Sequence, residues 1–142
     1  MKNILLVLLA FNLTSCEYLE EESDINNPCY DTFCTEEFIT VVVNITDEAE
    51  NPVILDDFKV INIDNNIDLT IPINSSEEDF TINEGLYPLI NDLSLSINQN
   101  IEVQFLGYIN EVEVVSENFI VFKDCCHVDV ADGDLKIIIP ND

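Results

Sequence analysis

Apolar and polar residues alternate along much of the chain beyond residue 37, which is the pattern of a strand that buries one face. Residues 38–46 carry Ile or Val at every second position from 39 to 45. Residues 101–109 repeat the pattern, with an apolar residue or Gly at each odd number. No segment keeps the 3.6-residue period of a helix. The pattern therefore predicts sheet rather than helix.

Shorter runs complete the set of predicted strands. Further strands are expected at residues 53–63, 67–73, 93–97, 112–115 and 119–123. Pro72 restricts the strand at 67–73 to an edge or an end of a sheet. Asn110 and Glu111 form a tight turn between 101–109 and 112–115, and a bulge is expected at Glu117 and Asn118. Residues 80–100, broken by Gly85 and Pro88, are the least regular region.

The dipeptide Asp132-Gly133 is the strongest hairpin signal in the sequence. A two-residue turn there sets Val130 opposite Leu135 and Asp129 opposite Lys136. That register places Val128, Val130, Leu135, Ile137 and Ile139 on the inner face. Continuing the alternation points Cys126 inward and places Cys125 and His127 on the outer face, with His127 beside Asp129.

The composition agrees with these strands. From residue 16 onward the chain has 30 Val plus Ile but only 11 Ala plus Leu, a balance that favours pleated sheet. We therefore expect an all-β fold: a single antiparallel two-sheet β-sandwich of about seven strands, transthyretin-like or Ig-like, spanning residues 29–142.

The charge excludes whole classes of function. The 142 residues include 4 basic and 29 acidic side chains, for a net charge of -25. Nucleic acids and anionic headgroups repel such a chain, because binding to phosphates needs a basic surface. The 47% of apolar residues is sufficient for a core, so the charge does not indicate disorder.

The first 15 residues have the layout of a secretory signal: a positive start, an apolar run at 4–11 and a short polar stretch. Leu13-Thr14-Ser15-Cys16 resembles the lipobox of bacterial lipoproteins, which implies cleavage before Cys16 and acylation of that residue. Ordinary signal cleavage and an uncleaved anchor are the alternatives. Residues 16–28 then form an acidic tether, which is either a solvated spacer or, by resemblance, the surface-export signal of Bacteroidota lipoproteins. We expect an outer-membrane lipid anchor facing the cell exterior.

Apart from Cys16 the chain has four cysteines, Cys29, Cys34, Cys125 and Cys126. An even number in an oxidising compartment predicts disulfides. A bond between the neighbours Cys125 and Cys126 would be strained, so we favour the two pairings that join the amino-terminal pair to the carboxy-terminal pair. A metal site at 125–127 is disfavoured, because adjacent strand residues point to opposite faces.

Several stretches resemble the transthyretin-like sandwich called the carboxypeptidase regulatory-like domain. They are Asp47, Asn51-Pro52-Val53, Phe58, Val60 and Gly107-Tyr108, with Glu50 where that family usually has Gly. Residues 29–139 also resemble small uncharacterised lipoproteins of Bacteroidota. The matching stretches are Cys34-Thr35, Glu37-Phe38, Pro52-Val53, Leu55-Asp56, Phe58, Tyr87-Pro88 and residues 124–128. The resemblance implies a non-catalytic module for folding, adhesion or an accessory role.

The sequence contains few motifs that predict a catalytic or ligand-binding site. Its three Gly are too scattered for a phosphate loop, and a Ser or Cys nucleophile would need His127, which we interpret as an ordinary strand residue. The absence of Trp weakens sugar binding, which leaves four Tyr as possible ring platforms. Calcium is the one ligand that the composition invites, although no EF-hand spacing is present and diffuse cation condensation is the alternative. The candidates are Asp64, Asp68, Asp129, Asp132 and Asp134.

These observations predict a lipid-anchored, non-catalytic structural or interaction module with no resident cofactor. We expect contact with the membrane through the lipid, an envelope protein as partner and no nucleic acid. The alternative is a calcium-binding or small-ligand-binding accessory lipoprotein of an envelope complex. An enzyme is not expected.

Overall fold

The computed structural model describes residues 29–73 and 82–140. The chain divides into two units, Met1–Tyr30 and Asp31–Asp142, and all strands of the described residues belong to the second. The predicted signal at 1–15 and the tether at 16–28, with Cys16, lie outside the described residues. No helix among the described residues is long and apolar enough to cross a bilayer.

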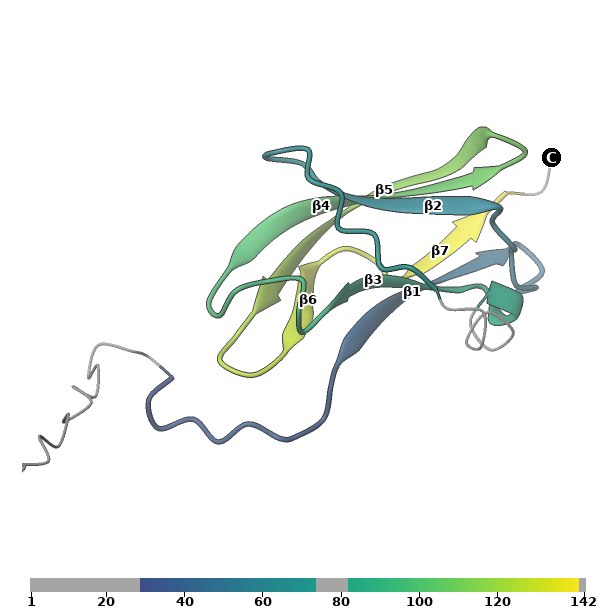
Figure 1. Ribbon diagram of the computed structural model, residues 1–142. Helices are drawn as coiled ribbons and strands as arrows, with labels where there is room; N and C mark the ends of the chain where they lie inside the picture. Colours follow the sequence, from purple (N-terminus) through teal and green to yellow (C-terminus); the bar gives the residue numbers. More distant parts are fainter. Residues whose placement is uncertain (1–28, 74–81, 141–142) are drawn as a thin grey trace, which may run out of the picture. The chain divides into compact units, whose positions relative to one another are not determined.

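The second unit is an all-β fold of two facing sheets, as predicted (Figure 1). One sheet has the order β3-β1-β7 and the other β2-β4-β5-β6. The strands are β1 (Thr40–Asp47), β2 (Asp57–Asn62), β3 (Leu86–Asn91), β4 (Asn100–Ile109), β5 (Val112–Lys123), β6 (Val128–Asp132) and β7 (Lys136–Ile139). A short 3-10 turn, η1 (Ile82–Glu84), precedes β3. All paired strands are antiparallel except β1 and β7, which run parallel.

The core lies between the sheets and follows the predicted alternation. Val43 and Ile45 on β1 belong to the same core cluster as Val103 and Phe105 on β4, and all four are fully buried. The rings of Phe58, Tyr87 and Phe105 form a cluster with centroids 5.5 to 6.3 Å apart. Such contacts add to the free energy that the buried apolar area contributes.

The β4–β5 hairpin confirms the predicted turn and corrects the predicted break. Asn110 and Glu111 have φ values of 50° and 65°, which suits a tight hairpin turn. β5 runs without interruption through residues 117 and 118, where a bulge was expected. The irregularity lies instead between Gly107 and Tyr108. A Cβ at Gly107 would lie 2.7 Å from Leu55 Cδ1, so the backbone comes close to a buried side chain there.

Two further strand predictions are wrong. The strand in the irregular region is β3, which includes Pro88, whereas residues 93–97 are not a strand. Pro88 is tolerated because β3 is an edge strand with a register shift opposite it. Residues 67–73 form only a bridge between Ile61 and Asp68 rather than a strand.

The predicted hairpin at Asp132-Gly133 is also wrong. β6 pairs with β5 and β7 pairs with β1, so the link at 133–135 crosses from one sheet to the other. Asp129 therefore lies opposite Phe122, and Lys136 lies opposite Asn44. The local turn signal is overridden because both strands gain longer neighbours in different sheets. The predicted inner residues still pack in or against the core: Val128, Val130, Leu135, Ile137 and Ile139.

Candidate functional site

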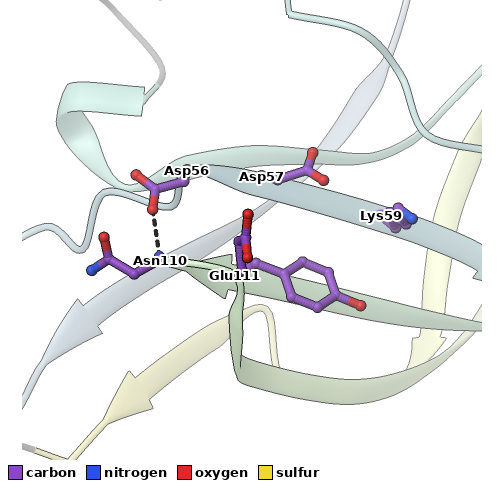
Figure 2. A pocket seen from close by; sticks show the side chains of 6 residues that line it. Asp56, Asp57, Lys59, Asn110 and Glu111 are labelled. Carbon is purple, nitrogen blue, oxygen red and sulfur yellow. Dashed lines mark hydrogen bonds between the residues drawn. The ribbon is translucent and has the colours of Figure 1, made fainter.

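A surface pocket of about 380 Å³ lies at one end of the four-stranded sheet. Figure 2 shows Asp56, just before β2, pointing toward Asn110 in the β4–β5 turn, with Asp57 and Lys59 following on β2. The lining residues are Asp56, Asp57, Lys59, Tyr108, Asn110 and Glu111. The pocket therefore depends on a turn and a strand start that are far apart in the sequence.

Two backbone contacts hold the pocket together. Asp56 N donates to Tyr108 O at 2.9 Å, and Asp56 Oδ2 accepts a hydrogen bond from Asn110 N at 2.6 Å (Figure 2). Asp57 lies opposite Tyr108 in the β2–β4 ladder. The carboxylate of Asp56 is thus engaged in fastening the turn to the loop before β2.

The remaining lining groups offer mixed chemistry. Asp57 and Glu111 supply carboxylates, Lys59 an ammonium group, and Tyr108 a half-buried ring with a hydroxyl. Pockets that bind small molecules combine an apolar or aromatic wall with a few polar groups. No spacing in the sequence predicted this site, although Gly107-Tyr108, one residue before the Asn110-Glu111 turn, was the available signal.

A second cluster surrounds the single histidine. His127 Nδ1 lies 3.0 Å from Asp92 Oδ2, and His127 Nε2 lies 2.9 Å from Thr35 Oγ1. The sequence had placed His127 beside Asp129 on an outer face. The structure instead gives it two partners from distant segments, and it is half-buried.

Asp92 is the centre of this cluster, and its side chain is only 11% exposed. Its carboxylate accepts hydrogen bonds from Ile39 N and Val128 N, each at 2.9 Å, as well as the contact with His127. Desolvation raises the pKa of Asp92, but the hydrogen bonds from Ile39, His127 and Val128 together outweigh it and lower the pKa below 3.8. Asp92 therefore joins three chain segments as an ionised acceptor.

The neighbouring Asp124 shapes the turn between β5 and β6. Asp124 Oδ1 accepts hydrogen bonds from Cys126 N at 2.6 Å and His127 N at 2.8 Å. These two bonds lower the pKa of Asp124. The turn fixes the backbone of His127 and leads the chain into β6.

Thr35, His127 and Asp92 follow the order hydroxyl, imidazole, carboxylate that hydrolases use for nucleophile activation. In such an enzyme the carboxylate serves to orient the imidazole. Here the same carboxylate also binds the backbone at the start of β1 and of β6. The contacts thus hold residues 35–39 against the sandwich, and we name the group of Thr35, Asp92 and His127 the latch.

A disulfide lies next to the latch. Cys34 and Cys126 are bonded across a sequence separation of 92 residues, which is one of the predicted links between the two cysteine pairs. Cys29 and Cys125 each take part in a disulfide as well. The disulfide at 34 and 126 brings Thr35 to His127, one residue further along each segment.

The five Asp residues predicted as calcium ligands lie in different turns and strands. Asp64 is in the turn after β2, and Asp68 accepts a hydrogen bond from Thr70 N at 2.9 Å, while hydrogen bonds with Thr70 lower its pKa. Asp129 and Asp132 belong to β6, and Asp134 follows it. Within residues 29–73 and 82–140, no three acidic, His or Cys side chains gather in a way that would hold a metal ion.

Comparison of the chain with protein-family models, with curated proteins and with solved structures finds no match. The resemblance to Bacteroidota lipoproteins and to the carboxypeptidase regulatory-like domain therefore stays a prediction.

Proposed function

We propose that the protein is a lipid-anchored lipoprotein of the outer membrane, displayed at the cell surface, that acts as a non-catalytic structural or interaction module. The observation that carries the proposal is the disulfide between Cys34 and Cys126. Disulfides persist in oxidising compartments, which agrees with export by the signal at 1–15 and acylation at Cys16.

The latch supports the structural role in this proposal, because it attaches the segment behind the tether to the sandwich. The segment that follows the acidic tether is joined to the sandwich by the disulfide at Cys34 and by the bonds of Thr35 and Ile39. A pull on the tether would therefore be borne by the β5–β6 turn and the end of β3 rather than by β1 alone. Such an attachment suits a domain held at a membrane surface.

The latch also has a structural use. Both ring nitrogens of His127 have partners, and Asp92 is engaged by two backbone N–H groups. A hydrolase triad makes the same contacts with its histidine, so the proposed role rests on what these contacts join. Here they join the segment at residues 35–39 to Asp92 and to β6, a structural use that favours a non-catalytic module.

Acylation is tested by feeding cells a labelled fatty acid and comparing the wild-type chain with Cys16→Ala. We expect label in the wild type and none in the variant, and Ser15→Ala serves as the matched control that keeps the cysteine. Label that persists in Cys16→Ala contradicts the lipid anchor. Protease treatment of intact cells then tests display: removal of the protein is expected, and full protection contradicts a surface location.

The role as an interaction module is tested by chemical cross-linking in intact cells, followed by isolation of the protein from solubilised envelope. We expect one or a few envelope proteins to be enriched over a Cys16→Ala control that lacks the anchor. Hydrolysis of ester or amide substrates that is lost in His127→Gln would contradict a non-catalytic role.

The pocket favours a second function, the binding of a small polar ligand, and the calcium binding expected from the sequence is tested with it. Its carboxylates, ammonium group and Tyr108 ring supply both acceptors and donors. Millimolar calcium at constant ionic strength should raise the melting temperature if the pocket or the acidic turns hold the ion. A melting temperature that does not change argues against a calcium site.

A further inference from the structure

The two sheets leave four edge strands: β3 and β7 in one sheet, β2 and β6 in the other. An edge strand presents unpaired backbone groups that another strand can join, and proteins usually block such edges. The four edges of this sandwich differ in how they are blocked. This difference identifies one edge as open to a further strand.

Three edges carry blocking features. β3 contains Pro88, which lacks a backbone donor, and its residues 87–90 are buried. The edge of β2 is covered by the following segment, since Leu69 N donates to Val60 O at 2.8 Å and Val60 N donates to Thr70 Oγ1 at 2.9 Å. β6 has a register shift at its end and charged side chains at Asp129 and Asp132.

Within the part of the chain that the structure describes, the edge of β7 has no Pro inside the strand, no covering segment and no register shift, and its one charged residue is Lys136. Asn44 N on β1 donates to Leu135 O at 2.7 Å, and in the parallel ladder the bonds to β1 continue at alternate residues, Ile137 and Ile139. The peptide groups of Lys136 and Ile138 therefore face away from β1. Lys136 N donates to Asp134 Oδ1 at 2.9 Å, which, as far as residues 29–73 and 82–140 are concerned, leaves Lys136 O and both backbone groups of Ile138 at the free edge.

The side chains of β7 also favour a neighbouring strand. Ile138 is 54% exposed on the outer face, and Ile137 and Ile139 pack against the core at its rim. The one charged residue, Lys136, is held by its own domain, because its Nζ lies 3.0 Å from Glu50 Oε1. Three consecutive Ile residues give this edge a high β-propensity.

The net charge of the chain determines which kind of partner strand can bind at the edge of β7. A second copy would bring another net charge of -25 to the same edge, and the two domains would repel each other. A strand with basic side chains on its outer face would be attracted by the negative charge of the domain. Apolar side chains on its other face would pack beside Ile137 and Ile139. Strand addition of this kind draws affinity from backbone bonds and specificity from alternate side chains.

We propose that the free edge of β7 binds an extended strand of a positively charged partner protein. This inference rests on the proposed role as an interaction module and names the surface and the chemistry of the partner. The partner strand lies beside Lys136–Ile139 and pairs with the outward backbone groups of Lys136 and Ile138.

The test uses the full chain with its disulfides intact and a synthetic nonapeptide that alternates Lys with Val. The control peptide keeps the charge but has Pro in place of the two central Val residues, so that it cannot form a ladder. At about 0.15 M salt, where charges further apart than about 8 Å are screened, we expect the alternating peptide to slow amide hydrogen exchange at Ile138. We expect it to bind about tenfold more tightly than the control, as two backbone hydrogen bonds imply.

Two variants locate the contact. Ile138→Pro removes an outward N–H without removing a bond to β1, and Ile138→Val keeps that N–H as the matched control. Binding should fall about tenfold in the first and stay within about twofold in the second. If Ile138→Pro fails to fold, Ile138→Lys places a positive charge on the strand and should weaken binding of the cationic peptide in the same way.

Equal binding of both peptides, or protection that falls on other strands, would overturn the inference in favour of diffuse attraction to an acidic surface. Undiminished binding by Ile138→Lys and Ile138→Pro would overturn it as well. These results leave the proposed function standing, because acylation at Cys16 and cross-linking to an envelope protein are measured without reference to β7.

Discussion

Gly133 offers the sharpest test of how the two sheets are connected. The residue has a φ of 117°, outside the region that side-chain-bearing residues readily adopt. A Cβ at this position would lie 2.4 Å from Cδ1 of Phe119, which is itself 1% exposed. Gly133→Ala therefore meets two penalties at once, one in the backbone and one in the core.

The magnitudes follow from those two observations. A residue forced into a sparsely populated backbone region costs about 1–3 kcal/mol. Displacing a buried ring to admit an extra carbon costs about 1–3 kcal/mol more. The free energy of unfolding should thus fall by about 2–6 kcal/mol, a large share of the roughly 5–15 kcal/mol of a typical domain.

Gly133→Asn separates this geometry from a tight hairpin. A two-residue type I′ turn accepts Asn readily, so a hairpin at Asp132-Gly133 would tolerate the change. The crossing connection would not, and we expect Asn to cost at least as much as Ala. Glu111→Gly is the control, because Glu111 already has a positive φ of 65° in an exposed turn and Gly relieves it.

Equilibrium unfolding in urea under non-reducing conditions measures all three variants. We expect Ala and Asn at position 133 to lower the midpoint without a change in slope, and Gly at position 111 to leave it unchanged or raise it. An Asn variant at position 133 within about 0.5 kcal/mol of the wild type would refute the reasoning.

Three further predictions concern the core, the latch and the disulfide. Tyr87→Phe should lower stability by about 1–3 kcal/mol in urea unfolding, because the Tyr87 hydroxyl accepts from Leu55 N at 2.7 Å and donates to Val53 O at 3.1 Å; an unchanged midpoint would contradict this role. Because the pKa of Asp92 is lowered in the folded state, the carboxylate contributes fully to the free energy of unfolding above pH 3.8. This contribution is lost as the pH falls through the pKa of the folded state. The stability difference between wild type and Asp92→Asn should therefore shrink below pH 3.8, and a gap independent of pH would count against the latch. Replacing Cys34 and Cys126 together by Ser should lower the melting temperature. The loss of stability should stay below the roughly 4–5 kcal/mol of an isolated loop of that length, because Cys29 and Cys125 each take part in a disulfide as well; an unchanged melting temperature would contradict a stabilising role of this disulfide.

The local signals that matched the structure share a short range. The alternation at residues 39–45 and 101–109 needs only one buried face, and the Asn110-Glu111 turn needs only two residues with positive φ. Asp132-Gly133 carried the strongest local hairpin signal, and no hairpin forms there. Its outcome depended on whether β6 and β7 gain more by pairing with each other or with β5 and β1.

The candidate sites were harder to predict for the same reason. The latch joins residues 35, 92 and 127, and the pocket joins 56–59 with 108–111. Neither group is contiguous, so no spacing rule applies to it. Asp92 in particular is one of 29 acidic residues and has no local mark to separate it from the rest.

The sequence alone determined the class of fold, the inward face of most strands, the strong negative charge and the pairing of an early with a late cysteine. These features follow from period, composition and count, which are properties of the chain itself. Only the tertiary structure decided which strands are neighbours, where the edges lie and which carboxylate meets His127. Those outcomes depend on competition between distant segments for the same partners, and that competition is settled only when the two sheets pack.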